Sequence, residues 1–329
     1  MRVPFILLKS RLAEAAALLV VAAMLAGAVR PAAAEDWPTR PLTLVIVFAP
    51  GSSIDFVGRA VASDLAASIG RPVVIETRSG GGGVVGTLFV AKAPPDGYTL
   101  LLNGVGPAAL RPLIDKSLGY DTKTDFTPII LLGEVPNVLL ANPQLGLKTV
   151  KDLVAYAESK GGKISIGHSG PGTMGHLATV LFGSEAGLDT TSVSYRGTAP
   201  MMIDVLGGTI DAGFPAYNPA TRQATVLAVT SAERVEFLPD VPTLIESGFD
   251  LVGGTWIAIF GPAHMPPEIV AKLNATIDAF LHNPETRRRF SEAGVRVLGG
   301  PPARLTERVI QDQTRWAKII AGIKFDNAN

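Results

Sequence analysis

A run of four glycines near the N-terminus is the first stretch whose residue types could do chemistry. "TRSGGGGVVG", residues 77–86, follows the apolar run "PVVIE" and leads into "TLFVAKA", which predicts a helix. Gly81, Gly83 and Gly86 match G-x-G-x-x-G, a pattern that lets the phosphates of a dinucleotide approach a helix start. A dinucleotide site also has an acidic residue about 20 positions further on, and residues 104–109 contain none. The glycines therefore do not predict a dinucleotide site.

Four loops rich in small residues follow predicted strands and share one kind of chemistry. Each loop places backbone N–H groups at the start of a predicted helix, where the helix dipole is positive. In an open parallel sheet, ligands bind beyond the carboxyl ends of the strands, where such loops lie. We therefore predict a site for a small anion, although tight turns alone also explain the glycines of any single loop. The loops are "APGSSID" (49–55), "RSGGGG" (78–83), "NGVGPAA" (103–109) and "GHSGPGTMG" (167–175).

Side chains suited to catalysis or metal binding are sparse. The four histidines stand at positions 168, 176, 264 and 282, and none belongs to H-E-x-x-H or another short metal-ligand spacing. "GHSGP" resembles the nucleophile elbow G-x-S-x-G, but Pro171 occupies the last position, so the strained turn is not specified. We predict no enzyme, no metal and no cofactor. A hydrolase that uses Ser169 and His176 is the catalytic alternative that stays open.

The first 34 residues have the pattern of a secretory signal peptide. Basic residues at the start precede an uncharged stretch at 15–29, and "AAA" precedes Glu35, so we expect export and cleavage after Ala34. The uncharged stretch is shorter than the roughly 20 apolar residues of a membrane-spanning helix. The chain has no cysteine, which excludes a lipid-modified cysteine at the cleavage site.

Charge and cysteine content narrow the class of protein further. The full chain has 29 basic and 29 acidic residues. Removal of the predicted signal peptide would remove four basic residues and one acidic residue, which leaves 25 basic and 28 acidic residues. A mildly acidic protein has no electrostatic reason to bind nucleic acid or an anionic membrane. About 295 residues can bury a sufficient core without disulfides. We therefore expect a large, well-cored fold and no thiol chemistry.

Short apolar runs alternate with helical periods along the chain, which predicts parallel sheets covered by helices. The alternation forms two series and therefore predicts two α/β lobes. We expect the first lobe to comprise residues 35–135 and 254–329, and the second to comprise 136–253. Extended segments near 133–138 and 252–256 would connect the lobes and act as a hinge.

Seven separate segments, spread in order from Trp37 to the last helix, resemble the substrate-binding proteins of tripartite tricarboxylate transporters. This family is also called the Bug receptors and is typified by the citrate-binding TctC protein. The segments are "WPTRPLTLVIVFAPGSSID", "GRPVVIETRSGGGGVVGT", "APPDGYTLLL", "PNVLLANP", "SYRGTAPMMIDVLGGTID", "LAVTSAERVEFLPDVPTLIESGF" and "MPPEIVAKLN".

The resemblance implies a two-lobed periplasmic-binding-protein fold of type II, which closes like a flytrap. It implies a monomeric periplasmic receptor that captures a mono-, di- or tricarboxylate and delivers it to the large and small membrane subunits of a transporter. An orphan receptor that presents its ligand to a sensor kinase is the alternative with the same fold.

The resemblance also implies which residues bind the ligand. Ser52 stands where the family usually has a second glycine, and Val105 and Pro107 stand where it often has Ser or Thr. Pro215 occupies a position that often carries an acidic specificity residue, and the lack of a carboxylate there argues against a ligand with an amino group. The expected ligand-binding residues are Phe48, Gly51, Ser52, Ser53, Asp55, Gly81, Gly82, Gly104, Val105, Ser169, Gly170, Gly172, Thr173 and Pro215.

Overall fold

The structure is a computed structural model of the 329-residue chain, and it describes residues 37–321. The expected signal peptide, residues 1–34, lies outside the described residues. The chain divides into two units, Met1–Thr39 and Arg40–Asn329, and the fold described below belongs to the second. No helix among residues 37–321 has the length and apolar character needed to cross a membrane.

The first sheet has six strands in the order β11-β4-β10-β3-β1-β2. Strand β1 pairs in parallel with both β2 and β3, whereas β10 runs antiparallel to β3 and β4. The sheet is therefore mixed, and only one side of it has the parallel pairing that the sequence predicts. Its strands are β1 (Leu42–Ile46), β2 (Val73–Thr77), β3 (Thr99–Gly104), β4 (Phe126–Pro136), β10 (Gly254–Pro262) and β11 (Arg296–Val297).

The second sheet has five strands in the order β7-β6-β8-β5-β9. Strand β6 pairs in parallel with β7 and β8, and β5 runs antiparallel to β8 and β9. Its strands are β5 (Val138–Ala141), β6 (Lys163–His168), β7 (Asp189–Ser194), β8 (Ala212–Gly213) and β9 (Thr225–Val229).

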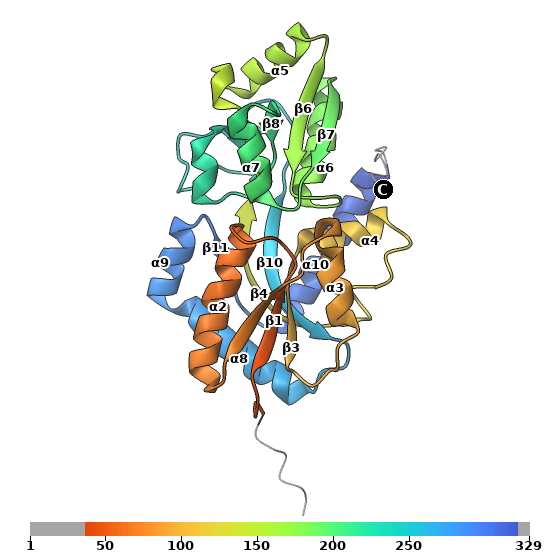
Figure 1. The fold of residues 1–329 in the computed structure, drawn as a ribbon, viewed down its shortest axis with the longest axis vertical. Coiled ribbons are helices and arrows are strands. Elements are labelled where there is room, and N and C mark those ends of the chain that lie inside the picture. The colour runs from red at the N-terminus through yellow and green to blue at the C-terminus, as the bar shows by residue number, and fades with distance from the viewer. Residues whose placement is uncertain (1–36, 322–329) are drawn as a thin grey trace, which may run out of the picture. The chain divides into compact units, whose positions relative to one another are not determined.

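Helices gather around each sheet, and the two groups are distinct in Figure 1. The first sheet is accompanied by α2 (Ser53–Ile69), α3 (Val84–Ala91), α4 (Arg111–Ile114), α8 (Pro267–His282), α9 (Pro284–Glu292) and α10 (Pro302–Ile320). The second is accompanied by α5 (Val150–Ser159), α6 (Met174–Ala186) and α7 (Thr198–Gly207). Short helical turns are η1 (Gly81–Gly83), η2 (Gly106–Leu110), η3 (Pro143–Leu145) and η4 (Pro219–Gln223).

Helix α2 shows how the sequence fixes the elements that lead to the site. Ser52 caps its start by accepting a hydrogen bond from the backbone N–H of Asp55, and Gly70 ends it in a left-handed conformation with φ of 67°. Val57, Val61 and Leu65, spaced four residues apart, are buried on one face. Complete burial of such a side chain contributes about 1.5–3 kcal/mol, so this face anchors α2 to the sheet and fixes where the helix begins.

The chain passes from the first sheet to the second between β4 and β5, at Asn137, and it returns just before β10. The two passages lie side by side because their backbones bond to a shared partner, Thr230. The Thr230 N–H donates to the Asn137 carbonyl at 2.9 Å, and the Gly253 N–H donates to the Thr230 carbonyl at 2.8 Å. This ladder holds the two connecting segments together.

Asp211 ties three elements of the second sheet to one another. Its Oδ2 accepts hydrogen bonds from the backbone N–H of Ser165 at 2.9 Å and from the Ser165 hydroxyl at 2.6 Å, and its Oδ1 accepts one from the Tyr156 hydroxyl at 2.9 Å. Burial alone would raise the pKa of Asp211, but the hydrogen bonds from Ser165 and Tyr156 and the charge of Lys160 together outweigh burial and lower this pKa. The ionised carboxylate therefore stabilises the contact of β8 with β6 and α5.

We expect Asp211→Asn to lower the free energy of unfolding at pH 7 by about 1–3 kcal/mol, because bonds to a charged group are lost. The folded-state pKa lies below the unfolded value of about 3.9. The stabilisation is thus present above pH ~4 and is lost as the pH falls through the folded pKa. Urea unfolding at pH 7 and at about pH 3 should show the difference between parent and variant shrinking in acid. Exposed Asp189 in β7 provides the control, Asp189→Asn, and an equal loss at both pH values would contradict the account.

Candidate functional site

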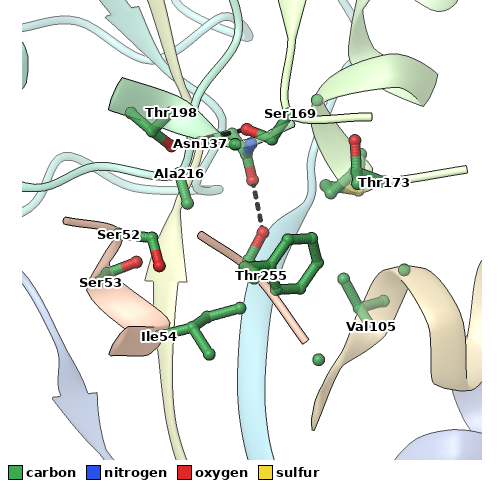
Figure 2. Close-up of a pocket in the computed structure, with 16 residues that line it drawn as sticks. Ser52, Ser53, Ile54, Val105, Asn137, Ser169, Thr173, Thr198, Ala216 and Thr255 are labelled. Carbon is green, nitrogen blue, oxygen red and sulfur yellow. Dashed lines mark hydrogen bonds between the residues drawn. The ribbon is translucent and has the colours of Figure 1, made fainter. Parts of the chain in front are cut away.

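A pocket lies where loops from both sheets meet (Figure 2). Its cavity volume is about 30 Å³. One water requires about 10–15 Å³ on this measure, so the cavity has room for only a few atoms in this conformation. The residues that line it are Phe48, Ser52, Ser53, Ile54, Gly104, Val105, Gly106, Asn137, Ser169, Thr173, Met174, Gly175, Gly197, Thr198, Ala216 and Thr255.

Three helices begin at this pocket. Helices α2, α6 and α7 begin at Ser53, Met174 and Thr198, and all three residues line the pocket. The side chains of Ser52 and Thr173, which precede α2 and α6, each accept a hydrogen bond from an N–H of the first turn. The other N–H groups of a first turn have no partner inside their helix, and the helix dipole makes this end positive. The pocket therefore combines N–H donors with a positive potential.

The hydroxyl of Ser53 is buried in this pocket without a hydrogen-bond partner among the described residues. The residue is only 3 % exposed. Leaving a buried hydroxyl unpaired costs about 1–3 kcal/mol, and a ligand that accepts a hydrogen bond from it would remove this cost. On the opposite side of the pocket, Ser169 Oγ and Thr198 Oγ1 lie 3.5 Å apart, at the outer limit of a hydrogen bond, so both hydroxyls can turn toward a ligand.

Asn137 joins the pocket to the segments that connect the two sheets. The Thr255 hydroxyl donates to Asn137 Oδ1 at 3.0 Å, as Figure 2 shows, and Asn137 Nδ2 donates to the Phe214 carbonyl at 3.3 Å. The Asn137 backbone N–H donates to the Thr230 hydroxyl at 2.9 Å. Asn137 thereby links residues of both sheets at the point where the chain passes between them.

None of the residues that line the pocket carries a formal charge. Asp55, at the start of α2, turns its carboxylate to the loop before the helix instead. Its Oδ2 accepts a hydrogen bond from the Gly51 N–H at 3.1 Å and another from Arg59 Nε at 3.1 Å. Asp55 therefore shapes the loop that carries Ser52 and Ser53. Among the described residues there is also no group of three or more acidic or histidine side chains that could hold a metal ion.

Two stacked histidines support the loop 169–173 through hydrogen bonds to its backbone. The rings of His168 and His176 lie 4.4 Å apart and nearly parallel. The Gly170 N–H donates to His168 Nδ1 at 3.2 Å, and the Gly172 N–H donates to His176 Nδ1 at 3.0 Å. Burial, followed by the neighbouring His176, lowers the pKa of His168 to about 3. His168 is therefore neutral near pH 7 and has a structural role in the loop.

The expected ligand-binding residues fall into two groups in the structure. One half line the pocket, namely Phe48, Ser52, Ser53, Gly104, Val105, Ser169 and Thr173. The other half lie outside its lining, namely Gly51, Asp55, Gly81, Gly82, Gly170, Gly172 and Pro215. The carbonyl of Pro215 accepts a hydrogen bond from the Val138 N–H at 3.0 Å, and the next residue, Ala216, lines the pocket in its place.

Several of these glycines instead lie where the two sheets' loops touch. A Cβ added to Gly82 would come within 2.1 Å of the Pro171 carbonyl oxygen, and one added to Gly172 would come within 2.1 Å of Arg111 Cδ. A Cβ at Gly170 would come within 3.0 Å of the Gly82 Cα. The glycines therefore allow the loop 78–83 to approach the loop 169–173 at backbone distance.

Asn137, Thr198 and Thr255 also line the pocket, and they were not among the residues predicted from the sequence. A signal for Thr198 was present, since "GTAPMM" places a glycine before a helical stretch, as in the other loops. Asn137 and Thr255 lie on extended segments that do not lead directly into a helix, and only the passage of the chain between the sheets brings them to the pocket.

A second cavity, of about 680 Å³, lies beside the connecting segments. It is lined by the end of β4, residues 230–237, β11 and parts of α9 and α10. Several of its charged groups pair with one another. Arg308 contacts Glu134 at 3.0 Å and Asp312 at 3.2 Å, and Arg296 also pairs with Glu134. The smaller pocket is the better candidate site because it holds the unpaired Ser53 hydroxyl and the three helix starts.

Comparisons with known proteins identify a family model and a relative that match most of the chain. The family model described as "Tripartite tricarboxylate transporter family receptor" (TctC) matches residues 57–325. The chain is 32% identical over 302 residues to "Protein BugT" of Bordetella pertussis. This match covers 90% of this chain and 93% of the relative.

Solved structures confirm the expected two-lobed α/β fold. The structure described as "R. palustris Rpa4515 with adipate" has a TM-score of 0.84 and 36% identity, covering 88% of this chain and 99% of that one. The structure described as "MatC (Rpa3494) from Rhodopseudomonas palustris with bound malate" has a TM-score of 0.82 and 31% identity. The match covers 86% of this chain and 100% of that chain. Both similarities extend through the two sheets and the segments between them.

Proposed function

Because the chain belongs to the tripartite tricarboxylate transporter receptor family, we propose that it binds a small organic acid between two lobes and catalyses no reaction. One observation carries the proposal. Three helix starts and the unpaired, buried Ser53 hydroxyl converge on a pocket that has no charged side chain. Such a pocket favours an anion over a neutral or cationic ligand.

The physical reason is that a carboxylate uses each feature of this pocket. Its oxygens accept hydrogen bonds from hydroxyls and N–H groups, and bonds to a charged acceptor are stronger than bonds between neutral groups. Each helix start contributes about 0.3–1 kcal/mol toward a negative charge. The adipate of Rpa4515 and the malate of MatC support an organic acid as the ligand class.

The proposed lobes are residues 35–135 with 254–329, and residues 136–253. A hinge at Asn137 and at the return passage before β10 would let them part and close. The pocket takes its lining from elements of both sheets, which supports a ligand that is enclosed by closure. The proposed binding residues are those that line the pocket, including Asn137, Thr198 and Thr255, whereas Gly82, Gly170 and Gly172 permit closure.

We propose that the mature chain acts as a monomer in the periplasm after removal of residues 1–34. It would deliver its ligand to the large and small membrane subunits of a tripartite transporter. Presentation of the ligand to a sensor kinase is the second proposal, and it uses the same pocket and the same closure. Co-purification with the membrane subunits would support the first partner.

The proposal predicts that organic acids stabilise the purified mature protein and that their amides do not. A ligand at a hundredfold excess over its Kd adds about 2.7 kcal/mol to the free energy of unfolding, which raises the melting temperature by several degrees. A thermal-shift screen of mono-, di- and tricarboxylates, each beside its amide, makes the comparison. Amides that stabilise as well as the acids would refute an anion site.

Ser53→Ala separates ligand binding from folding. Removing an unpaired buried hydroxyl should leave the stability of the ligand-free protein unchanged or slightly higher. Affinity for the tightest acid of the screen should fall about tenfold, or 1.4 kcal/mol. The matched control is Thr190→Val in β7, because the Thr190 hydroxyl is also buried without a partner but lies outside the pocket lining. Calorimetry that finds parental affinity in Ser53→Ala would exclude Ser53 as a ligand donor.

Gly82→Ala tests the contact between the loops. The same substitution at Gly187, which ends α6, is the control, because the two glycines have φ of +66° and +65° and share the backbone strain. A Cβ at Gly187 meets nothing within 4 Å, whereas a Cβ at Gly82 meets the Pro171 carbonyl. We expect Gly82→Ala to weaken binding of the tightest acid at least tenfold and Gly187→Ala to leave it unchanged. Equal affinities in the two variants would show that closure does not need this contact.

A further inference from the structure

Two apolar side chains, Ile54 and Val105, lie at one end of the pocket, and the hydroxyl of nearby Thr255 is already bonded to Asn137. In Figure 2, Ser169 and Thr198 lie above the space and Ser52 and Ser53 beside it, whereas Ile54 and Val105 lie below it. A carboxylate placed among the serines and the helix starts therefore has an apolar surface at its other end.

Val105 forms one part of this apolar surface. It follows β3 directly and is only 1 % exposed. Ile54 is its neighbour in the lining, and Ile54 Cδ1 lies 3.4 Å from the point where a Cβ of Gly104 would stand. Both side chains end in methyl groups, so neither offers a ligand a hydrogen-bond donor, and the neighbouring Thr255 hydroxyl already donates to Asn137.

The helical turn η2, which begins next to Val105 at Gly106, supplies fewer N–H donors than the other helix starts. Pro107 has no backbone N–H, which removes one donor from the first turn. The Gly172 carbonyl oxygen from the opposite loop lies 3.2 Å from the point where a Cβ of Gly106 would stand. A carbonyl oxygen so near the start of η2 disfavours a second negative charge there.

We propose that the ligand is a monocarboxylate whose remaining atoms are apolar. The inference rests on the proposed function and concerns the same pocket. A second carboxylate would have to leave water for a surface without a cation or a free side-chain donor, and burying an unpaired charge is far more unfavourable than burying a methyl group.

Calorimetry with matched pairs of acids tests the inference on the unaltered mature protein. The pairs are butanoate with succinate, hexanoate with adipate, and benzoate with terephthalate, each with the amide of its monoacid. We expect the monoacid to bind at least tenfold more tightly than its diacid in every pair that binds. A diacid that binds within tenfold of its monoacid, or more tightly, overturns the inference and leaves the proposed function standing.

Failure of the proposed function has a different signature in the same measurements. If no acid of either kind binds, or if the amides bind as well as the monoacids, the pocket is not an anion site and the inference falls with it.

Val105→Thr tests the position of the apolar surface. The substitution keeps the size of the side chain and places a hydroxyl beside the ligand, so the preference for the monoacid should shrink at least threefold. Val90→Thr in α3 is the control, because Val90 is equally buried but lies outside the pocket lining. It should lower stability and leave the preference unchanged. An unchanged preference in a folded Val105→Thr variant would overturn the proposed orientation of the ligand.

Discussion

An anion in the proposed pocket would be held without a cation, and this constraint accounts for the arrangement of the helix starts around it. No residue of the lining is charged, so the stabilisation has to come from hydroxyls and from the starts of α2, α6 and α7. Helix dipoles act only within the first turn, which requires the three helices to begin within a few ångströms of the same point. The caps at Ser52 and Thr173 and the buried face of α2 serve this placement.

Convergence of helix starts that belong to two sheets also demands that backbones come close. Side chains would keep the loops 78–83 and 169–173 apart, and Gly82 and Gly170 lack them where a Cβ would meet the opposite loop, whereas a Cβ at Gly172 would meet Arg111. The stacked pair His168 and His176 fixes the backbone of one of these loops. Stability and recognition are thereby separated: Asp55 and the histidines shape the loops, whereas Ser53 remains unpaired.

The sequence predicts local features well and long-range features less well. The apolar runs at 42–46 and 73–77 are strands, and Ser52, Ser53 and Ser169 reach the pocket because each loop follows a strand directly. The antiparallel pairing of β10 with β4 was not predicted, since it depends on the return of the chain from the second sheet. For the same reason Asn137 and Thr255 were missed. The contact of Gly82 with Pro171 joins segments about ninety residues apart, and no local pattern reports such a contact.

The most direct test of the central claim is the identity of the molecule that the protein binds when it is purified from its own periplasm. Native mass spectrometry of the folded protein, followed by release and identification of the bound molecule, gives that identity. The account predicts an acid that carries a carboxylate at neutral pH. An amine, an uncharged sugar or another ligand without a negative charge would contradict it.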